Sequence, residues 1–529
     1  MIKSTLDPAC TGLFSPLFLD YLKQKDSLKD FYHEYPKIEN FEKMLKERVF
    51  GAEKREVLVR RLWAQYGELE DGPVSRNIQS LIQGNTFTVT TGHQLNLMTG
   101  PLYFIYKIVS TIRLAEELKE HYPDYSFVPV YWMASEDHDF AEINHFLFDG
   151  KKYVWETDQK GPVGEFYLDK GIQELVSELD FLPGFLKEAY QKGKQLKDAV
   201  RKYVHHLFSH KGLVILDGND KALKQLFIPV IKDDVFHQNA NELVNASNVS
   251  LEKLGYKTQV FPREINFFYM KNGLRERIIR SNGVFEVINQ EIRWQEDELL
   301  EEIENFPDRF SPNVVMRPLY QETILPNLAY LGGPAEVAYW FQLKKIFDFY
   351  KVGFPFVLPR NFVLITPVNI TRKIRKLGLS PCDLFKDVDL LRKQFVKTTS
   401  SFDLDLPDEK SRLSGMFDEL YDKAGGVDKT LQTSVKAAGT RAQKTLQQVA
   451  EKFRKAEEKK KSTEVRRLYE IKETLFPGNT PQERKLNFLQ FYLEDDTFID
   501  KLYRFFDPLD FNFIILSQDE IKGGAQKTL

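Results

Sequence analysis

The stretch FTVTTGHQLNLMTGPLYFIYK, residues 87–107, decides the fold of this chain. It begins with β-branched residues that predict a strand over residues 86–90, and it continues through a loop that holds one histidine and two glycines. The Thr-Gly-Pro at 99–101 predicts a helix start, because proline at the first helical position lacks only a donor that would be unpaired anyway. Apolar residues then recur at helical spacing from Ile105 to Leu118, so this helix has one buried face.

A second strand completes the unit. Residues 127–133 are apolar enough for a strand that is buried on both faces. Strand, helix and strand within roughly 45 residues make a βαβ unit, which predicts a parallel sheet and an α/β fold. We expect residues 212–220 and 354–365 to add further strands, and residues 327–347 repeat the pattern of strand, glycine turn, proline and helix.

Two segments between these elements have a different pattern of apolar and polar residues. Residues 147–170 and 255–293 carry short alternating strands, which we interpret as small β-rich insertions. The second segment contains Asn272-Gly273 and Asn282-Gly283, and this dipeptide is the strongest short signal for a hairpin turn.

The C-terminal third predicts a long helical hairpin. Apolar residues between Leu431 and Ala456 recur mostly at alternating steps of four and three among dense charged residues, which is typical of a helix with a narrow apolar seam. Apolar positions at 384–395 and 413–421 supply helical partners, and AGGV at 424–427 supplies a turn. The charged run of this helix is expected to be a solvated face. One hairpin cannot cover the whole seam, so we expect a homodimer through the coiled coil.

Composition excludes several partners. The net charge of -3 from 74 basic and 77 acidic residues gives no overall attraction to nucleic acid or an anionic membrane. The N-terminus lacks the apolar core of a secretory signal, and no stretch reaches the roughly 18 apolar residues of a membrane span. Cys10 and Cys382 lie far apart without metal-ligand spacing, which suggests neither a disulfide framework nor a zinc site. We therefore expect a cytoplasmic protein in a reducing compartment, with no nucleic-acid or membrane partner.

Polar loops follow three of the predicted strands. Ligands of open parallel sheets bind beyond the carboxyl ends of the strands, so these loops are the candidate site. The candidate binding and catalytic residues are Gly92, His93, Gln94 and Asn96 in the first loop, Ser135, Glu136, Asp137, His138 and Asp139 in the second, and Gly332 and Gly333 in the third, with Arg317, Gln321 and Glu322 just upstream of the third strand. No Walker loop, Gly-x-Ser-x-Gly elbow, zinc-finger spacing or kinase signature is present, which excludes several large enzyme classes.

Each loop also has a structural explanation. His93 can donate to a phosphate or carboxylate, or transfer a proton near neutral pH, but it can also satisfy loop backbone groups. The acids around His138 can hold an ammonium or sugar hydroxyls, orient a base or bind a divalent metal, whereas Ser135 or Asp137 can also simply start a helix. A His-Glu-x-x-His pattern is missing, so no metal is predicted. The glycine pair of the third loop can be a tight turn, and Arg317 is a candidate carboxylate clamp.

Four motifs together resemble one known family. They are TTGHQLNLMTGPLYFIYKI, VPVYWMASEDHDFAEINH, RPLYQETILPNLAYLGGPAEVAYW and PFVLPRNFVLI, closed by the coiled-coil segment. The combination resembles the cysteine-adding enzymes of bacillithiol biosynthesis, the BshC family of cysteine ligases, over nearly the whole chain. The resemblance implies a Rossmann-like parallel core with two connecting-peptide insertions, related in plan to class I aminoacyl-tRNA synthetases, and a coiled coil for dimerisation.

The domains expected from the sequence and this resemblance follow the changes in composition and residue pattern along the chain. They are a Rossmann-like core over residues 1–379 with insertions near 141–207 and 250–300, a helical coiled-coil domain over 380–476, and a C-terminal segment over 477–529 that returns to the core.

The resemblance also implies an activity, the attachment of cysteine to glucosaminyl malate as an amide in the last step of bacillithiol biosynthesis. Amide formation from a carboxylate in water needs activation, so ATP, another nucleotide or a pre-activated cysteine is required, although the Lys-x-Ser-Lys-Ser-like loop of the nucleotide-using relatives is absent. In this hypothesis His93 stabilises phosphate charge, and His138 or Asp139 is the base for the attacking amine. The alternatives are an adenylate-forming or nucleotidyl-transferring enzyme on another small acid, and a non-catalytic coiled-coil scaffold.

Overall fold

Five parallel strands form the centre of the computed structural model, which describes residues 1–518. Their order is β13-β12-β2-β3-β6. The strands are β2 (Thr86–His93), β3 (Ser126–Met133), β6 (Val214–Asp217), β12 (Asn327–Gly332) and β13 (Phe356–Pro359). All eight residues of β2 are buried, as a central parallel strand with both faces covered requires. The register pairs His93 with Met133, so the carboxyl ends of β2 and β3 lie side by side. The predicted α/β fold is confirmed.

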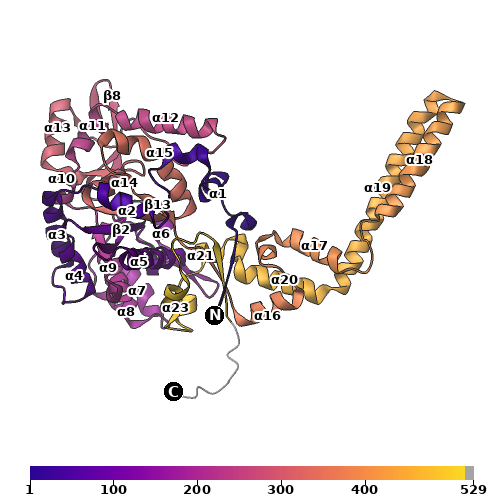
Figure 1. Ribbon diagram of the computed structural model, residues 1–529, viewed down its shortest axis with the longest axis horizontal. Coiled ribbons are helices and arrows are strands. Elements are labelled where there is room, and N and C mark those ends of the chain that lie inside the picture. Colours follow the sequence, from indigo (N-terminus) through magenta and orange to yellow (C-terminus); the bar gives the residue numbers. More distant parts are fainter. Residues whose placement is uncertain (519–529) are drawn as a thin grey trace, which may run out of the picture.

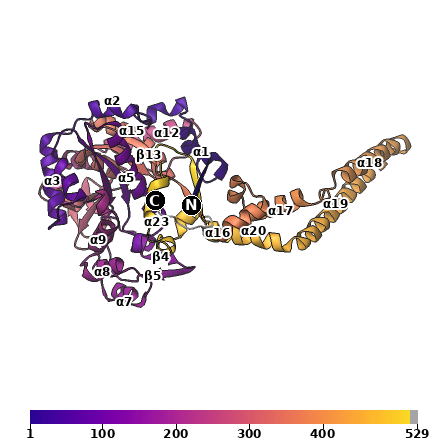
Figure 2. The same cartoon turned by 60° about the horizontal axis from the view of Figure 1, so that its bottom comes forward.

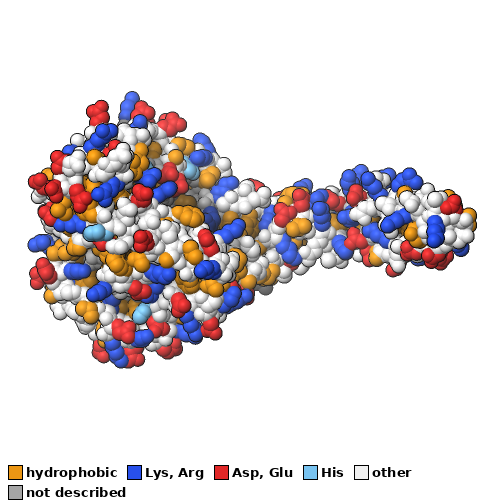
Figure 3. All heavy atoms as spheres, turned by 90° about the horizontal axis from the view of Figure 1, so that it is seen from above, with side chains coloured by type: hydrophobic (Ala, Val, Ile, Leu, Met, Phe, Trp, Pro, Cys, Tyr) orange, Lys and Arg blue, Asp and Glu red, His pale blue; other side chains and the backbone are white. Residues whose placement is uncertain are grey.

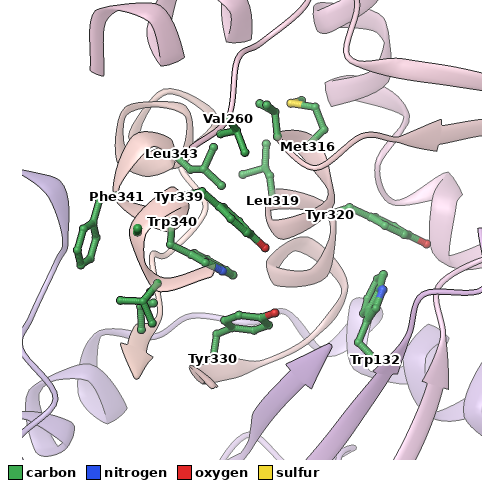
Figure 4. Close-up of a cluster of buried hydrophobic side chains, with 14 of the residues drawn as sticks. Trp132, Val260, Met316, Leu319, Tyr320, Tyr330, Tyr339, Trp340, Phe341 and Leu343 are labelled. Carbon is green, nitrogen blue, oxygen red and sulfur yellow. The ribbon is translucent and has the colours of Figure 1, made fainter. Parts of the chain in front are cut away.

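Helices pack against both sides of this sheet (Figure 1). Helix α5 (Tyr103–His121) packs on β2 and β3, and α15 (Pro334–Tyr350) packs on β12 and β13. Figure 4 shows the core beside α15, where Tyr339 lies toward Leu319 of α14 (Met316–Ile324) and the rings of Tyr330 and Trp340 pack together, with centroids 4.8 Å apart. Full burial of an apolar side chain such as Leu319 contributes about 1.5–3 kcal/mol to stability.

The two insertions differ from each other. The second is a five-stranded sheet, β10-β9-β8-β7-β11, and both predicted Asn-Gly turns are confirmed, since all four of their residues have positive φ. The strands are β7 (Phe267–Lys271), β8 (Leu274–Ser281), β9 (Val284–Val287), β10 (Arg293–Trp294) and β11 (Phe310–Pro312).

The first insertion is mainly helical. The β-rich prediction holds only for the hairpin of β4 (His145–Phe148) and β5 (Lys151–Val154). Three helices follow this hairpin: α7 (Lys170–Glu178), α8 (Gly184–Lys192) and α9 (Leu196–Phe208).

A helical arm projects from the body (Figures 1 and 2). Its tip is an antiparallel hairpin of α18 (Pro407–Val427) and α19 (Lys429–Lys460), as predicted, and its base contains α16 (Val368–Leu377), α17 (Val388–Thr399) and α20 (Ser462–Leu475). The predicted turn was placed too early, because residues 424–427 are helical. The chain turns at Asp428, whose carboxylate accepts from the Thr430 amide and caps α19.

The surface of the arm is strongly charged. Most of the lysine and arginine side chains of α19 are exposed, as the charged run predicted, and Figure 3 shows side chains of both signs along the arm. Within residues 1–518, no helix has both the length and the hydropathy to cross a bilayer.

A three-stranded sheet joins the body to the base of the arm. Strand β15 (Phe513–Ser517) pairs with β1 (Ile2–Leu6) on one side and β14 (Val363–Thr366) on the other. The prediction of one strand over residues 354–365 was therefore wrong, because β13 and β14 belong to different sheets. The chain leaves the central sheet after Pro359, and the Asn361 side-chain amide donates to the Asp507 carbonyl at 2.7 Å.

The two cysteines are joined, which corrects the expectation that they form no disulfide. Cys10 and Cys382 have Cα atoms 5.7 Å apart and form a disulfide across 372 residues of sequence. The turn at Pro8–Thr11 packs against the turn at Pro381–Phe385 near the base of the arm. Sequence separation carries no information about such tertiary proximity, so the spacing rule could not find this pair.

Candidate functional site

Two adjoining cavities lie beyond the carboxyl ends of the central strands. The first, of about 300 Å³, lies between the ends of β2 and β12, and we call it the cationic cavity. The second, of about 360 Å³, lies between the end of β3 and the second insertion, and we call it the polar cavity. Trp132, Ala134 and Arg317 line both cavities, so a ligand in one lies next to a ligand in the other.

Positive side chains dominate the cationic cavity. The charged residues of its lining are Lys107, Arg317, Arg360, Arg484 and Glu336. Four cations and one carboxylate leave an excess of positive charge, and partial burial strengthens its attraction for an anion. One Nη atom of Arg317 is buried without a hydrogen-bond partner among the described residues. Because an unmade bond to a buried charged group is costly, this atom favours a ligand oxygen in the cavity.

Lys107, which is buried, and Glu336, whose side chain is 25% exposed, form an ion pair on the wall of this cavity. The Lys107 Nζ lies 2.6 Å from a Glu336 carboxylate oxygen and donates to the Gly92 carbonyl at 2.8 Å. Burial lowers the pKa of Lys107, and the Glu336 carboxylate opposes this effect. Burial would raise the pKa of Glu336, but Lys107, the Gly333 amide and the Tyr330 hydroxyl hold it below its usual value. Glu336 is therefore a carboxylate near neutral pH, and its contact with Lys107 favours the ammonium form of that lysine.

The glycine that ends β12 makes room for this pair. A Cβ atom on Gly332 would lie 2.8 Å from the Glu336 Cβ, which is closer than real Cβ contacts come. Gly332 thus allows Glu336 to fold back onto the strand end, although Gly332 itself does not line either cavity.

His93 lies in the cationic cavity as a neutral imidazole. Its side chain packs against Tyr103 and Phe104, and its Nε2 is buried without a partner among the described residues. Burial, together with the charges of Lys107 and Arg360, lowers the pKa of His93 well below its ordinary value. A neutral imidazole still offers one donor and one acceptor, so His93 can hydrogen-bond an oxyanion or accept a proton, but it adds no charge at pH 7.

Replacing His93 with asparagine is expected to reduce the acid sensitivity of folding. In the wild type the unfolded chain binds a proton near pH 6.5 and the folded chain does not, so stability is lost as the pH falls below about 6.5, by at most about 1.4 kcal/mol per pH unit. The variant lacks this component. Urea unfolding between pH 7.5 and 5 measures it, and equal pH slopes for the two proteins would contradict a neutral, buried His93.

The second loop lines the polar cavity with side chains that already have partners. The Ser135 hydroxyl donates to Asp217 at 2.5 Å, and Glu136 forms an ion pair with the buried Lys224. Asp137 accepts from the Gln94 amide at 2.7 Å, which ties the second loop to the first. The polar lining opposite these acids is completed by Arg275 of β8 and by Asn313.

His138 and Asp139 lie at the edge of the polar cavity rather than in its lining. The His138 Nδ1 is 2.5 Å from a guanidinium nitrogen of Arg275, and burial and this charge lower the pKa of His138. Asp139 is exposed and caps the short helix α6 (Phe140–Ile143) by accepting from the Glu142 amide. The cap explains Asp139 without a substrate, whereas His138 touches a residue that lines the cavity.

Three further candidate residues lie inside the protein. Glu322 has no exposed side-chain surface and accepts from Arg48, Gln321 and Asn327. Gln321 also accepts from Arg317 at 3.0 Å, so it orients an arginine of the site without lining a cavity. Asn96 belongs to the first loop and is buried.

The structure therefore brings together part of the predicted set. Gly92, His93, Gln94, Gly333 and Arg317 line the cationic cavity, and Ser135, Glu136, Asp137 and Arg317 line the polar cavity. Asn96, His138, Asp139, Gln321, Glu322 and Gly332 line neither.

Sequence reasoning missed four cations of the site, three that line the cationic cavity and Arg275 in the polar cavity. Lys107 lies on the helix face that the apolar periodicity marked as core, and the presence of a lysine among those apolar residues was the available signal. Arg360 lies inside the strand that was predicted over residues 354–365, whereas Arg484 lies far along the chain and carried no signal at all. Among residues 1–518, no group of three or more His, Cys, Asp or Glu side chains is placed to hold a metal ion.

Comparison with known proteins gives consistent matches along the chain. A family model described as the N-terminal Rossmann-like domain of bacillithiol biosynthesis BshC matches residues 1–361, and one described as its C-terminal coiled-coil domain matches residues 363–518. Proteins named "Putative cysteine ligase BshC" are similar over nearly their full length. The one from Flavobacterium johnsoniae is 43% identical over 96% of this chain and 98% of its own. The one from Cytophaga hutchinsonii is 42% identical over 94% and 96%.

Proposed function

This chain belongs to the BshC family of bacillithiol biosynthesis and is a cysteine ligase, and we propose that it joins the carboxyl group of cysteine to the amine of glucosaminyl malate. The product is an amide, and the reaction is the last step of bacillithiol formation. The observation that carries the proposal is the pair of adjoining cavities, one rich in cations and one lined by acids and two arginines.

The cationic cavity suits the malate part of the acceptor. Malate carries two carboxylates, and arginine and lysine side chains bind carboxylates through charge-assisted hydrogen bonds. Arg317 and His93 each present a buried nitrogen that lacks a protein partner among the described residues. The excess of positive charge in this cavity favours a dianion over a neutral sugar.

The polar cavity suits cysteine, which carries both charges of an amino acid. Asp137 offers carboxylate oxygens to the ammonium group, and Arg275 offers a guanidinium to the carboxyl group. We propose His138 as the base that takes the proton from the attacking amine, because its lowered pKa keeps it neutral near pH 7. Its Nδ1 accepts from Arg275, so Nδ1 takes the amine proton once the Arg275 guanidinium has turned to the cysteine carboxyl group. Asp139 is the weaker candidate, since its carboxylate caps α6.

Activation of the cysteine carboxyl group is a separate requirement. We propose that ATP, another nucleotide or a pre-activated cysteine supplies it. The cationic cavity that suits malate also suits phosphate oxygens. Binding of glucosaminyl malate and of ATP, each measured on variants of the cavity residues, shows which of the two ligands the cavity holds.

We also propose that the arm pairs with a second copy of the chain. Apolar side chains of the hairpin remain exposed, among them Met416, Leu420, Leu431 and Phe453. Burial of such a row against an identical hairpin would remove apolar surface from water.

Thiol profiling of cells that lack the gene tests the function. We expect glucosaminyl malate to accumulate and bacillithiol to be absent, and the wild-type gene to restore both levels. His138→Ala is expected to restore less than a tenth of the bacillithiol, as loss of a general base costs about 10²–10⁴ in rate. The matched control is His121→Ala, which removes an exposed histidine at the far end of α5. An unchanged thiol pool in the deletion strain would contradict the proposed function.

A further inference from the structure

A segment that follows the arm returns to the active site. After α20 the chain forms α21 (Gln482–Lys485), and the Gln482 side chain accepts from the Ile365 amide at 3.0 Å and donates to the Ile365 carbonyl at 3.1 Å. The next residue, Glu483, receives two hydrogen bonds from the buried Arg360, at 2.8 and 2.6 Å. These buried contacts fix the backbone of α21 against the body.

The same segment holds the loop between β2 and α5. The Asn487 amide donates to the carbonyls of Met98 and Gly100, both at 2.7 Å, and the Leu102 amide donates to the Leu486 carbonyl at 2.8 Å. Met98 and Thr99 have positive φ, which costs residues other than glycine of the order of 1–3 kcal/mol each. Contacts from outside the loop must offset this cost, and Asn487 supplies two of them. The loop that begins after His93 thus depends on a residue 389 positions after Met98.

The hydrogen bonds of this segment place Arg484 at the cationic cavity. It lies between the two anchors, Glu483 and Asn487, and it lines the cavity with an exposed side chain. Lys107 pairs with Glu336, Arg360 with Glu483, and Arg317 donates to Gln321. Among the described residues that line this cavity, Arg484 is the only charged one whose side chain makes no hydrogen bond or ion pair.

This combination separates Arg484 from an ordinary surface arginine. The backbone around Arg484 is held in place, because Glu483 before it and Asn487 after it are both buried and hydrogen-bonded. Placing a fourth cation beside three others costs Coulomb energy in the absence of an anion. An anion in the cavity removes that cost and gains a bidentate donor.

We propose that Arg484 binds an anionic group of the ligand in the cationic cavity, so that the segment after the arm forms one wall of the active site. This inference rests on the proposed function for the identity of the ligand, a malate carboxylate, and not for the existence of the anion site. Arg484 is a binding residue here, whereas Glu483 and Asn487 position it.

Calorimetric titration of the full chain with glucosaminyl malate and, separately, with ATP tests the inference. Arg484→Gln is expected to weaken binding of glucosaminyl malate about 10- to 100-fold, because a charge-assisted pair is lost. The matched control is Arg504→Gln, which removes another exposed arginine outside both cavities and should bind like the wild type. Arg484→Lys should recover part of the loss, since it restores the charge without the planar fork.

Each outcome of this titration decides one question. Equal binding by the wild type and Arg484→Gln would overturn the inference while leaving the proposed function in place. If the wild type does not bind glucosaminyl malate but binds ATP, and Arg484→Gln weakens ATP binding, the proposed acceptor is rejected and the anion site is supported. A wild type that binds neither probe would overturn both.

Discussion

Replacing Lys107 with methionine is expected to lower the rate of cysteine addition at least about 100-fold and to destabilise the protein by about 3–5 kcal/mol. The variant removes a cation from the cavity wall and leaves the partly buried Glu336 carboxylate without its partner. The Gly92 carbonyl also loses its donor, so the end of β2 is less firmly held. Purified protein, assayed for product by mass spectrometry and unfolded in urea, gives both quantities.

A second variant separates the two effects of this change. Lys107→Met combined with Glu336→Gln removes both charges of the pair, so no isolated charge remains buried, and most of the stability should return. The new side-chain amide can still accept a hydrogen bond from the Tyr330 hydroxyl or the Gly333 amide, which both donate to Glu336 in the wild type. Activity should stay low, because the cavity still lacks the cation that stabilises a bound anion. Recovery of activity along with stability would show that Lys107 serves only the fold.

The central sheet was predictable because its signals are local. Residues 86–133 contain a β-branched run, a proline at a helix start and an apolar strand, and each signal needs only neighbours in sequence. The arm was predictable for the same reason, since its apolar spacing persists over many turns. The break between β13 and β14 was not, because residues 354–365 are largely apolar and only tertiary partners assign the two halves to different sheets.

The candidate site was predictable only in its position. Strand ends placed Gly92, His93 and Asp137 near one another, and the hydrogen bond from Gln94 to Asp137 shows how the first two loops meet. The ion pair of Lys107 on α5 with Glu336 on α15 was not predictable, because the two residues are far apart in sequence. Arg484, which also lines the cavity, is farther still along the chain. Polarity beside a strand marks a residue that needs a partner, but it does not tell whether that partner is a ligand or another part of the chain.

Replacing Glu322 with alanine is expected to lower the free energy of unfolding by about 3–5 kcal/mol. Glu322 was predicted to bind substrate, but its partners are other residues of the chain. Its carboxylate is fully buried, and burial raises its pKa while Arg48, Gln321 and Asn327 oppose the rise. Alanine would leave the Arg48 guanidinium buried without its carboxylate, and two amide groups without an acceptor. The kcat and KM of the folded protein should change less than about threefold, because Glu322 lines neither cavity.

Two controls decide whether Glu322 serves the fold or the substrate. Glu301→Ala removes an exposed acid from α13 (Glu296–Asn305) and should leave stability within about 0.5 kcal/mol of the wild type. Arg48→Met combined with Glu322→Leu replaces the buried pair with apolar side chains and should be more stable than Glu322→Ala alone, since no buried charge is left unpaired. Urea unfolding and steady-state kinetics on these proteins separate the two roles. A fully stable Glu322→Ala protein that cannot add cysteine would contradict the structural role and return Glu322 to the substrate site.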